Sequence, residues 1–302
     1  MSGSRIMRPI WMERPSVAGQ VSKAAVLVAV CLLVAFPFLV IVSTSLSSAE
    51  TLDQTGGYVV FPTSLDFSAY EAILSGGIVT RAVLVSVGVT VAGTAVSLVA
   101  TVLLAYGLSR RGSFAHRTLL AIVLLTFLFP PGVIPSYLVV KELGLLDTYA
   151  SLVLPTAVSA FNVVIMRGFF MNVPQELLDS ARIDGAGEWR VLLTIVLPLS
   201  KAVLAVIGLF YAVAYWNAFF TAMLYLNDTA KWPLQLLLRT YVLGGSTLGG
   251  SSSFDPGGAA SLPPVQSVQM AVVVIALVPI LCVYPFLQRH FATGVLTGAV
   301  KG

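Results

Sequence analysis

Six long apolar segments, separated by short polar stretches, dominate the pattern of the chain. Each reaches about 20 residues, the length that an α-helix needs to cross the hydrocarbon core of a bilayer. We predict these spans near residues 23–45, 82–108, 118–140, 149–170, 199–225 and 267–288. Several contain proline, which membrane helices tolerate where neighbouring groups satisfy the freed backbone. The pattern therefore predicts an all-α, polytopic membrane protein with six transmembrane helices within residues 23–292, flanked by segments 1–22 and 293–302.

The composition agrees with a protein that is mostly membrane. Of the 302 residues, 57% are hydrophobic and only 10% are charged, whereas soluble domains carry about 25% charged residues. The apolar run after Lys23 is longer than the core of a cleaved signal peptide, so we interpret it as an uncleaved first span. The two cysteines, Cys31 and Cys282, fall within predicted spans and indicate neither a disulfide framework nor a metal site.

The placement of charges predicts the orientation. With the N-terminus in the cytoplasm, thirteen of the 17 Lys and Arg residues lie on the inner side. Eight of the 13 acidic residues then lie on the outer side. This agrees with the excess of basic residues in cytoplasmic loops, and an even number of spans places both termini inside. The net charge of +4 is thus a topology signal, and nothing in the sequence indicates nucleic-acid binding.

One inner loop, residues 171–198, is charged and broken by glycine. Asn172 and Pro174 indicate a helix start, and Gly185 allows a sharp turn with positive φ before a second helix. Two readings follow from the residues alone. The loop forms two interfacial helices lying on the inner leaflet, or it is a helix-turn-helix that docks a soluble partner.

The outer side carries two longer segments. Residues 46–81 contain a short amphipathic helix near 66–74, ended by glycines. Residues 226–266 form a long external loop whose middle, 244–258, is rich in Gly and Ser and is expected to be mobile. The flanks of this loop are candidates for contact with an external partner.

Several absences narrow the function. The chain has no phosphate-binding loop of the G-x-x-x-x-G-K-[ST] type, so an ATPase would be a separate polypeptide. It has no metalloprotease or serine-hydrolase motif, and we expect no catalytic residue, no metal and no cofactor of its own. The predicted spans contain no acidic residue deep in the membrane, which argues against an ion-coupled secondary carrier.

The spacing in the inner loop resembles the cytoplasmic "EAA" loop of ABC importer permeases. Asp179-Ser180-Ala181 fills the EAA slot, Gly185 follows after three intervening residues, and Ile195 with Leu197-Pro198 follows after nine more. From about residue 60 to the end, the chain resembles carbohydrate-type permeases related to the maltose system. Four motifs carry this likeness: Ala105–Arg110 (AYGLSR), Phe129–Tyr137 (FPPGVIPSY), Trp216-Asn217, and the GAVKG terminus at 298–302.

The resemblance implies a type I ABC importer permease in the cell membrane. Such importers pair two permease subunits with two ATPase subunits, which hold ATP and Mg, and with an extracytoplasmic solute-binding protein. This chain would be the second permease and half of the translocation pathway for a sugar or oligosaccharide. The inner loop would hold the coupling helix that contacts the ATPase, through Glu176, Asp179, Ala181, Asp184, Gly185 and Ala186. The tail would reach the ATPase as a thin extended segment, through Gly298, Val300 and Lys301.

Polar and aromatic residues within the spans are candidates for the sugar path. They are Asn162, Tyr215, Trp216 and Asn217. Pathway polar groups must face protein or water, and sugar sites need hydrogen bonds and flat aromatic faces. The alternative is that the asparagines only join helices by hydrogen bonds. Two other functions stay open at this point: a permease for a non-sugar solute and, with less support, a secondary carrier.

Overall fold

The computed structural model describes residues 16–75, 77–110, 112, 115–244 and 264–299, and every regular element in these ranges is a helix. Three helices are long: α1 (Val17–Ser45), α4 (Ile78–Ser109) and α15 (Val265–Ala299). Shorter helices include α2 (Ala49–Thr55), α3 (Ser68–Leu74), α6 (Val133–Glu142), α7 (Ala150–Val153), η1 (Leu154–Thr156), α13 (Phe219–Tyr225), η3 (Thr229–Lys231) and α14 (Leu234–Gly244). The others are α5 (His116–Leu128), α8 (Ala160–Met171), α9 (Gln175–Ile183), α10 (Glu188–Val191), the π-helix η2 (Leu192–Val196), α11 (Leu197–Leu199) and α12 (Lys201–Trp216).

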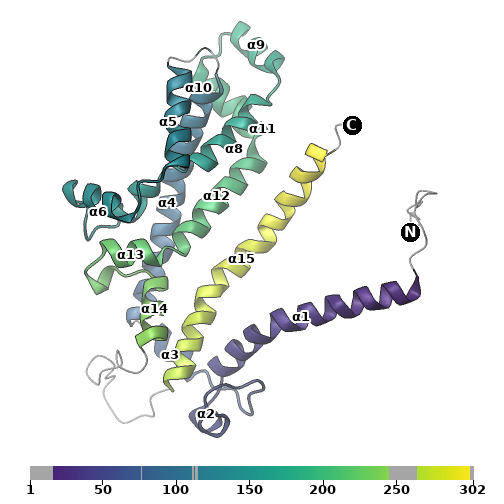
Figure 1. The fold of residues 1–302 in the computed structure, drawn as a ribbon, viewed down its shortest axis with the longest axis vertical. Helices are drawn as coiled ribbons and strands as arrows, with labels where there is room; N and C mark the ends of the chain where they lie inside the picture. The colour runs from purple at the N-terminus through teal and green to yellow at the C-terminus, as the bar shows by residue number, and fades with distance from the viewer. Residues whose placement is uncertain (1–15, 76, 111, 113–114, 245–263, 300–302) are drawn as a thin grey trace.

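The three long helices confirm the first, second and sixth predicted spans. Each has a stretch long and apolar enough to cross a membrane, and each begins a few residues earlier than predicted. In α1 only the last turn is buried, and most of the helix projects away from the rest of the chain (Figure 1). Pro37 lies inside α1 and Pro279 inside α15 without ending either helix.

The other three predicted spans are not straight helices. Each consists of two helical parts that meet at a sharp bend: 119° between α5 and α6, 54° between the α7–η1 pair and α8, and 85° between the α10–α11 segment and α12. The first bend contains Pro130 and Pro131, which lack backbone donors, followed by Gly132 with φ +79°. The described residues therefore contain three helices long and apolar enough to cross a membrane, or up to six spans if each bent pair counts as one.

The predicted fifth span, 199–225, is wrong at both ends. Its membrane helix α12 stops at Trp216, and α13 is a separate short helix after Asn217. On the other side, residues 188–199 already form helix before the bend at Ser200. A hydropathy pattern registers the apolar run but not these two changes of direction.

The main core lies where α4 crosses α8 and α12. Two tyrosines of α12 bond across to α4: the hydroxyls of Tyr211 and Thr101 lie 2.7 Å apart, as do those of Tyr215 and Ser97. Gly93 lets α4 approach the Tyr215 ring closely, since a Cβ at this position would lie 2.8 Å from that ring. Packing of small residues and interhelical hydrogen bonds is how helices associate in a membrane.

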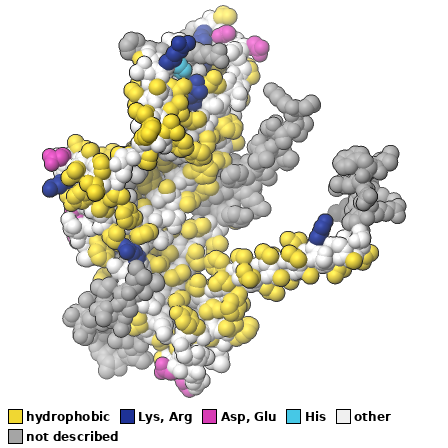
Figure 2. All heavy atoms as spheres, in the orientation of Figure 1, with side chains coloured by type: hydrophobic (Ala, Val, Ile, Leu, Met, Phe, Trp, Pro, Cys, Tyr) yellow, Lys and Arg dark blue, Asp and Glu magenta, His cyan; other side chains and the backbone are white. Residues whose placement is uncertain are grey.

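The molecule has two polar ends and a largely apolar middle. The α9 and α10 helices form one end, and α2, α3 and α14 lie at the other (Figure 1). Hydrophobic side chains cover much of the visible surface between them (Figure 2). The predicted external helix near 66–74 is α3, whose first amide at Ser68 donates to the carboxylate of Asp66. The Gly- and Ser-rich stretch 245–258 lies outside the described residues.

Candidate functional site

The inner loop, residues 171–198, is built around a tight turn at Gly185. The α9 helix ends there in a Schellman motif: the amide of Gly185 donates to the carbonyl of Arg182 (3.0 Å) and that of Ala186 to the carbonyl of Ala181 (2.8 Å). Gly185 has φ +80°, and a Cβ on it would meet nothing within 4 Å. The predicted turn is confirmed, and its need for glycine is conformational rather than steric.

The two faces of α9 differ in what they contact. Leu178 is 1% exposed, and Ala181 and Ala186 are half-buried against the main core. On the opposite face Ile183 is 86% exposed. The acidic residues expected to meet a partner, Glu176, Asp179 and Asp184, are all exposed. The six predicted contact residues thus divide into two that hold the loop on the protein and four that face outward.

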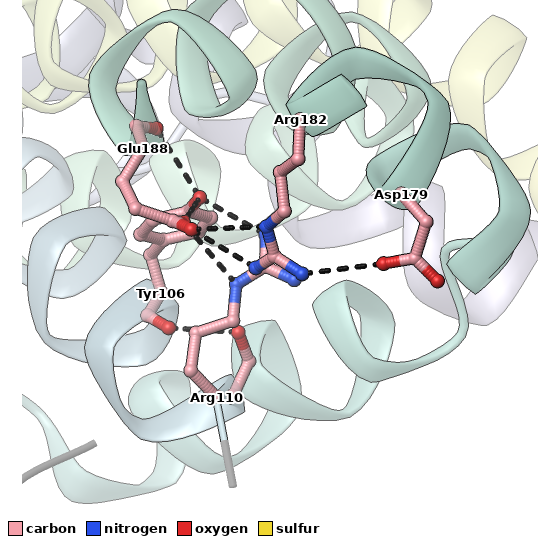
Figure 3. Close-up of polar contacts among 6 residues, drawn as sticks. Tyr106, Arg110, Asp179, Arg182 and Glu188 are labelled. Carbon is pink, nitrogen blue, oxygen red and sulfur yellow. Dashed lines mark hydrogen bonds and ion pairs between the residues drawn. The ribbon is translucent and has the colours of Figure 1, made fainter. Parts of the chain in front are cut away.

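A network of charged and aromatic side chains fastens this loop to the end of α4 (Figure 3). Glu188, the first residue of α10, is its centre. Its Oε1 accepts from Nη2 of Arg182 (2.9 Å), and its Oε2 accepts from the hydroxyl of Tyr106 (2.5 Å). That hydroxyl accepts from Nη2 of Arg110 (2.9 Å), whose guanidinium carbon lies 4.6 Å from the Tyr106 ring centroid. Nη1 of Arg182 also reaches Asp179 (3.3 Å).

The network joins the end of α4 to two consecutive helices, α9 and α10, that lie far from it in sequence. Tyr106 and Arg110 lie one turn apart at the end of α4, while Arg182 and Glu188 flank the Gly185 turn. The Glu188 carboxylate raises the pKa of Arg182 further above its usual range. Isolated exposed ion pairs contribute only about 0–1 kcal/mol to stability, but several charges together can fix a geometry. We therefore interpret the network as positioning the loop relative to α4.

At the level of α8, α12 and α13 the surface is hollowed by a groove of about 650 Å³. We call this the aromatic groove. Four exposed phenylalanines line it: Phe161, Phe210, Phe219 and Phe220. The other lining residues are Leu152, Thr156, Ser159, Asn162, Tyr211, Ala214, Tyr215, Asn217, Ala218 and Thr221, so none of the lining residues carries a charge.

The structure brings three of the four predicted path residues to this groove. Asn162 is 5% exposed, and its side-chain amide forms no hydrogen bond with another described residue. Asn217 is exposed, and its Nδ2 donates to the carbonyl of Val213 (2.9 Å). Tyr215 lines the groove, but its hydroxyl bonds to Ser97. Tyr215 thus joins α12 to α4, whereas the bond of Asn217 stays within the end of α12 and joins no two helices.

Trp216 is not at the groove, which corrects the prediction. Its Nε1 donates to the carbonyl of Ala276 in α15 (3.1 Å), and it packs with a second hydrophobic cluster. The reason is helical geometry: neighbouring residues point about 100° apart, so Tyr211 and Tyr215 share a face from which Trp216 turns away.

The C-terminal tail also differs from the prediction. Residues 293–299 continue α15 as helix instead of forming a thin extended segment. Single glycines such as Gly294 and Gly298 lower helix propensity by about 1 kcal/mol each but do not by themselves end a helix. Val300 and Lys301 lie outside the described residues, so their proposed contact stays a prediction.

Sequence reasoning missed the network and most of the aromatic groove. Two signals were available: the i, i+4 pair of Tyr106 and Arg110 beside the inner loop, and the Phe219-Phe220 pair just after Asn217. Across the described residues, no group of three or more His, Cys, Asp or Glu side chains is placed to hold a metal ion.

Comparison with known proteins identifies the relatives of the chain. Residues 93–297 match the family described as "Binding-protein-dependent transport system inner membrane component". The polygalacturonan/rhamnogalacturonan transport system permease protein YtcP of Bacillus subtilis is 48% identical over 90% of this chain and 94% of its own. Protein LplC of the same organism is 46% identical (88% and 89%). The sn-glycerol-3-phosphate transport system permease protein UgpE of Rhizobium meliloti is 30% identical (88% and 92%).

Two solved structures share the fold. One is a bacterial ABC transporter involved in the import of the acidic polysaccharide alginate, with a TM-score of 0.83 and 30% identity. The match covers 94% of this chain and all of that one. The other is a bacterial alginate ABC transporter in complex with alginate pentasaccharide-bound periplasmic protein. It has a TM-score of 0.54 and 15% identity over 90% and 94% of the chains, a likeness in fold alone.

Proposed function

The chain belongs to the binding-protein-dependent transport system inner membrane components, and we propose that it carries an oligosaccharide through half of an ATP-driven importer. It is a multi-pass membrane protein and a transport subunit of the ABC importer type. Its partners are a second permease, an ATPase pair and an extracytoplasmic solute-binding protein. A saccharide substrate is supported by the names of two relatives, the polygalacturonan/rhamnogalacturonan permease at 48% identity and the alginate importer.

The observation that carries the proposal is the construction of the inner loop. A polar, outward-facing helix presents an exposed apolar side chain, Ile183, beside the acids Glu176, Asp179 and Asp184. The loop has a defined position, because Gly185 sets its turn and Glu188 links it to the end of α4. A soluble subunit that closes against this surface would therefore move α4 together with the loop.

The movement has a physical route to the aromatic groove. The α4 helix bonds to α12 through the tyrosine hydroxyls at 211 and 215, and both tyrosines line the groove. A shift of α4 relative to α12 would change the width of the groove and the position of its Phe rings. In this account, Asn162 and Asn217 offer amides to sugar hydroxyls while the Phe rings contact the apolar faces of the sugar.

The remaining parts of the assignment follow from topology. The inner loop and both termini lie in the cytoplasm, in line with the basic residues on that side. We assign ATP and Mg to the partner ATPase, because the sequence of this chain has no phosphate-binding loop. The relative named for sn-glycerol-3-phosphate supports one alternative, a permease for a smaller non-sugar solute.

The test is reconstitution of the importer in proteoliposomes with the second permease, the ATPase pair and the binding protein. Binding protein loaded with oligosaccharide should stimulate ATP hydrolysis and drive uptake, and the purified chain alone should hydrolyse no ATP. Stimulation by glycerol phosphate but by no oligosaccharide would favour the alternative. Hydrolysis by the isolated chain, free of copurifying subunits, would contradict the assignment.

A further inference from the structure

One cation lies beside the uncharged aromatic groove, on its outer side. Arg239 belongs to α14, and its guanidinium carbon lies 5.4 Å from the centroid of the Phe219 ring. Phe219 lines the groove and is 40% exposed. Both α13 and α14 lie away from the end of the molecule that carries α9 (Figure 1). A solute that enters the groove from outside therefore passes a positive charge before it meets a lining of neutral groups.

This charge has no acidic partner within the part of the chain that the structure describes. The ion pairs found there involve Arg110, Arg182 and Lys231. Two of the acids predicted to lie outside, Asp147 and Asp228, are both engaged by Lys231, at 2.7 and 3.9 Å. Within the same described ranges, the hydrogen bond of Arg239 is donated by Nη1 to the sulfur of Met223. A guanidinium has five N–H donors, so most of those of Arg239 are available to a ligand.

From this arrangement we propose that Arg239 binds the carboxylates of an anionic, uronate-containing oligosaccharide as it enters the aromatic groove. A planar guanidinium forms paired hydrogen bonds to a carboxylate, and stacking on Phe219 orders it in advance. The Phe rings behind it suit the flat faces of pyranose rings, which a small phosphate ester lacks. The inference rests on the proposed function and adds the charge class of the substrate.

The test uses the complete importer in proteoliposomes with loaded binding protein in excess, so that uptake reports steps after delivery. The probes are trigalacturonate and its carboxyl-reduced trisaccharide, which has the same length but no charge. In Arg239→Gln, uptake of trigalacturonate should fall roughly tenfold or more, the scale of a lost charge-assisted hydrogen bond, while uptake of the reduced sugar should not change. Arg239→Lys should recover part of the loss.

The matched control is Arg81→Gln, since Arg81 is also an outer arginine, is exposed and does not line the aromatic groove. This variant should transport both probes like the wild type. If the binding protein does not bind the neutral trisaccharide, the dependence of trigalacturonate uptake on ionic strength is measured instead. Raising salt from about 0.05 to about 0.5 M should slow the wild type and leave Arg239→Gln unaffected, because salt screens exposed charges.

The outcomes separate the inference from the function on which it rests. Equal loss of both probes in Arg239→Gln, or no loss of either, would overturn the role of Arg239. Wild-type uptake of neutral oligosaccharides without uptake of trigalacturonate would overturn the uronate class and leave the importer assignment intact. A wild-type importer that transports no oligosaccharide would remove the proposed function itself.

Discussion

Replacing Gly185 by alanine should uncouple the importer without unfolding it. The residue has φ +80°, where an L-amino acid is less stable than glycine by about 1–2 kcal/mol. Because a Cβ at this position meets nothing within 4 Å, no steric clash adds to that figure. The whole effect therefore falls on the Schellman turn, whose population relative to other loop conformations should drop about 5- to 30-fold.

The chain offers a matched control two residues away. Gly187 also has open space around its Cβ position, but its φ is −70°, which any residue adopts. Gly187→Ala should therefore leave transport unchanged. Gly185→Asn should fall between wild type and Gly185→Ala, since asparagine tolerates positive φ better than alanine.

The assay compares three quantities in membranes and proteoliposomes: abundance of the chain, copurification of the ATPase, and uptake per assembled complex. For Gly185→Ala we expect near-normal abundance and uptake reduced several-fold, on the scale of the turn's lost population. Wild-type uptake at wild-type abundance would refute the role of the turn. An equal loss in Gly187→Ala would show that the loop tolerates no added methyl group and that positive φ is not the reason.

Three further predictions test other parts of the account. In a double-mutant cycle of Arg182→Gln and Glu188→Gln, ATPase stimulation should show a coupling energy of about 0.2–1 kcal/mol, and strictly additive losses would argue against the network. The pKa of Asp147 is lowered first by the hydrogen bond from Lys231 and then by that from the Asp228 amide. The backbone amides of this outer turn should therefore stay protected from hydrogen exchange above about pH 4 and lose protection as the pH falls through that lowered pKa. Loss of protection already at pH 6 would contradict this. Gly93→Ala should lower the free energy of unfolding in detergent by about 1–3 kcal/mol through overpacking, whereas Gly88→Ala, with open space at its Cβ, should not. Equal stability of the two variants would refute the close approach of α4 to the Tyr215 ring.

Hydropathy predicted where apolar helix occurs but not where it bends. The run 118–140 is continuous in composition, yet it turns by 119° near Pro130 and Pro131. Membrane helices often tolerate proline, so the residue type alone does not tell a kink from a reversal. The bend at Ser200 follows a π-helical stretch at 192–196, a local change in hydrogen bonding that depends on packing.

At the candidate sites, features set by neighbouring residues were predictable from the sequence, whereas contacts between residues far apart in the sequence were not. The turn at Gly185 was predictable because a helix end, a charged loop and glycine occur together within a few residues. The link from Glu188 to Tyr106 was not, since it joins positions 82 residues apart. Trp216 shows the same limit: its neighbour Tyr215 lines the groove, but only the packing of α15 reveals that the indole faces the other way.

The central claim is that the tip of the inner loop meets the ATPase on the cytoplasmic side. Its most direct test is Ile183→Cys in a background where Cys31 and Cys282, both exposed, are replaced by serine. In the assembled importer this cysteine should crosslink to the ATPase subunit, and in intact cells it should resist a membrane-impermeant maleimide. Labelling from outside, or a fully assembled and active complex in which no crosslink to the ATPase forms, would contradict the account.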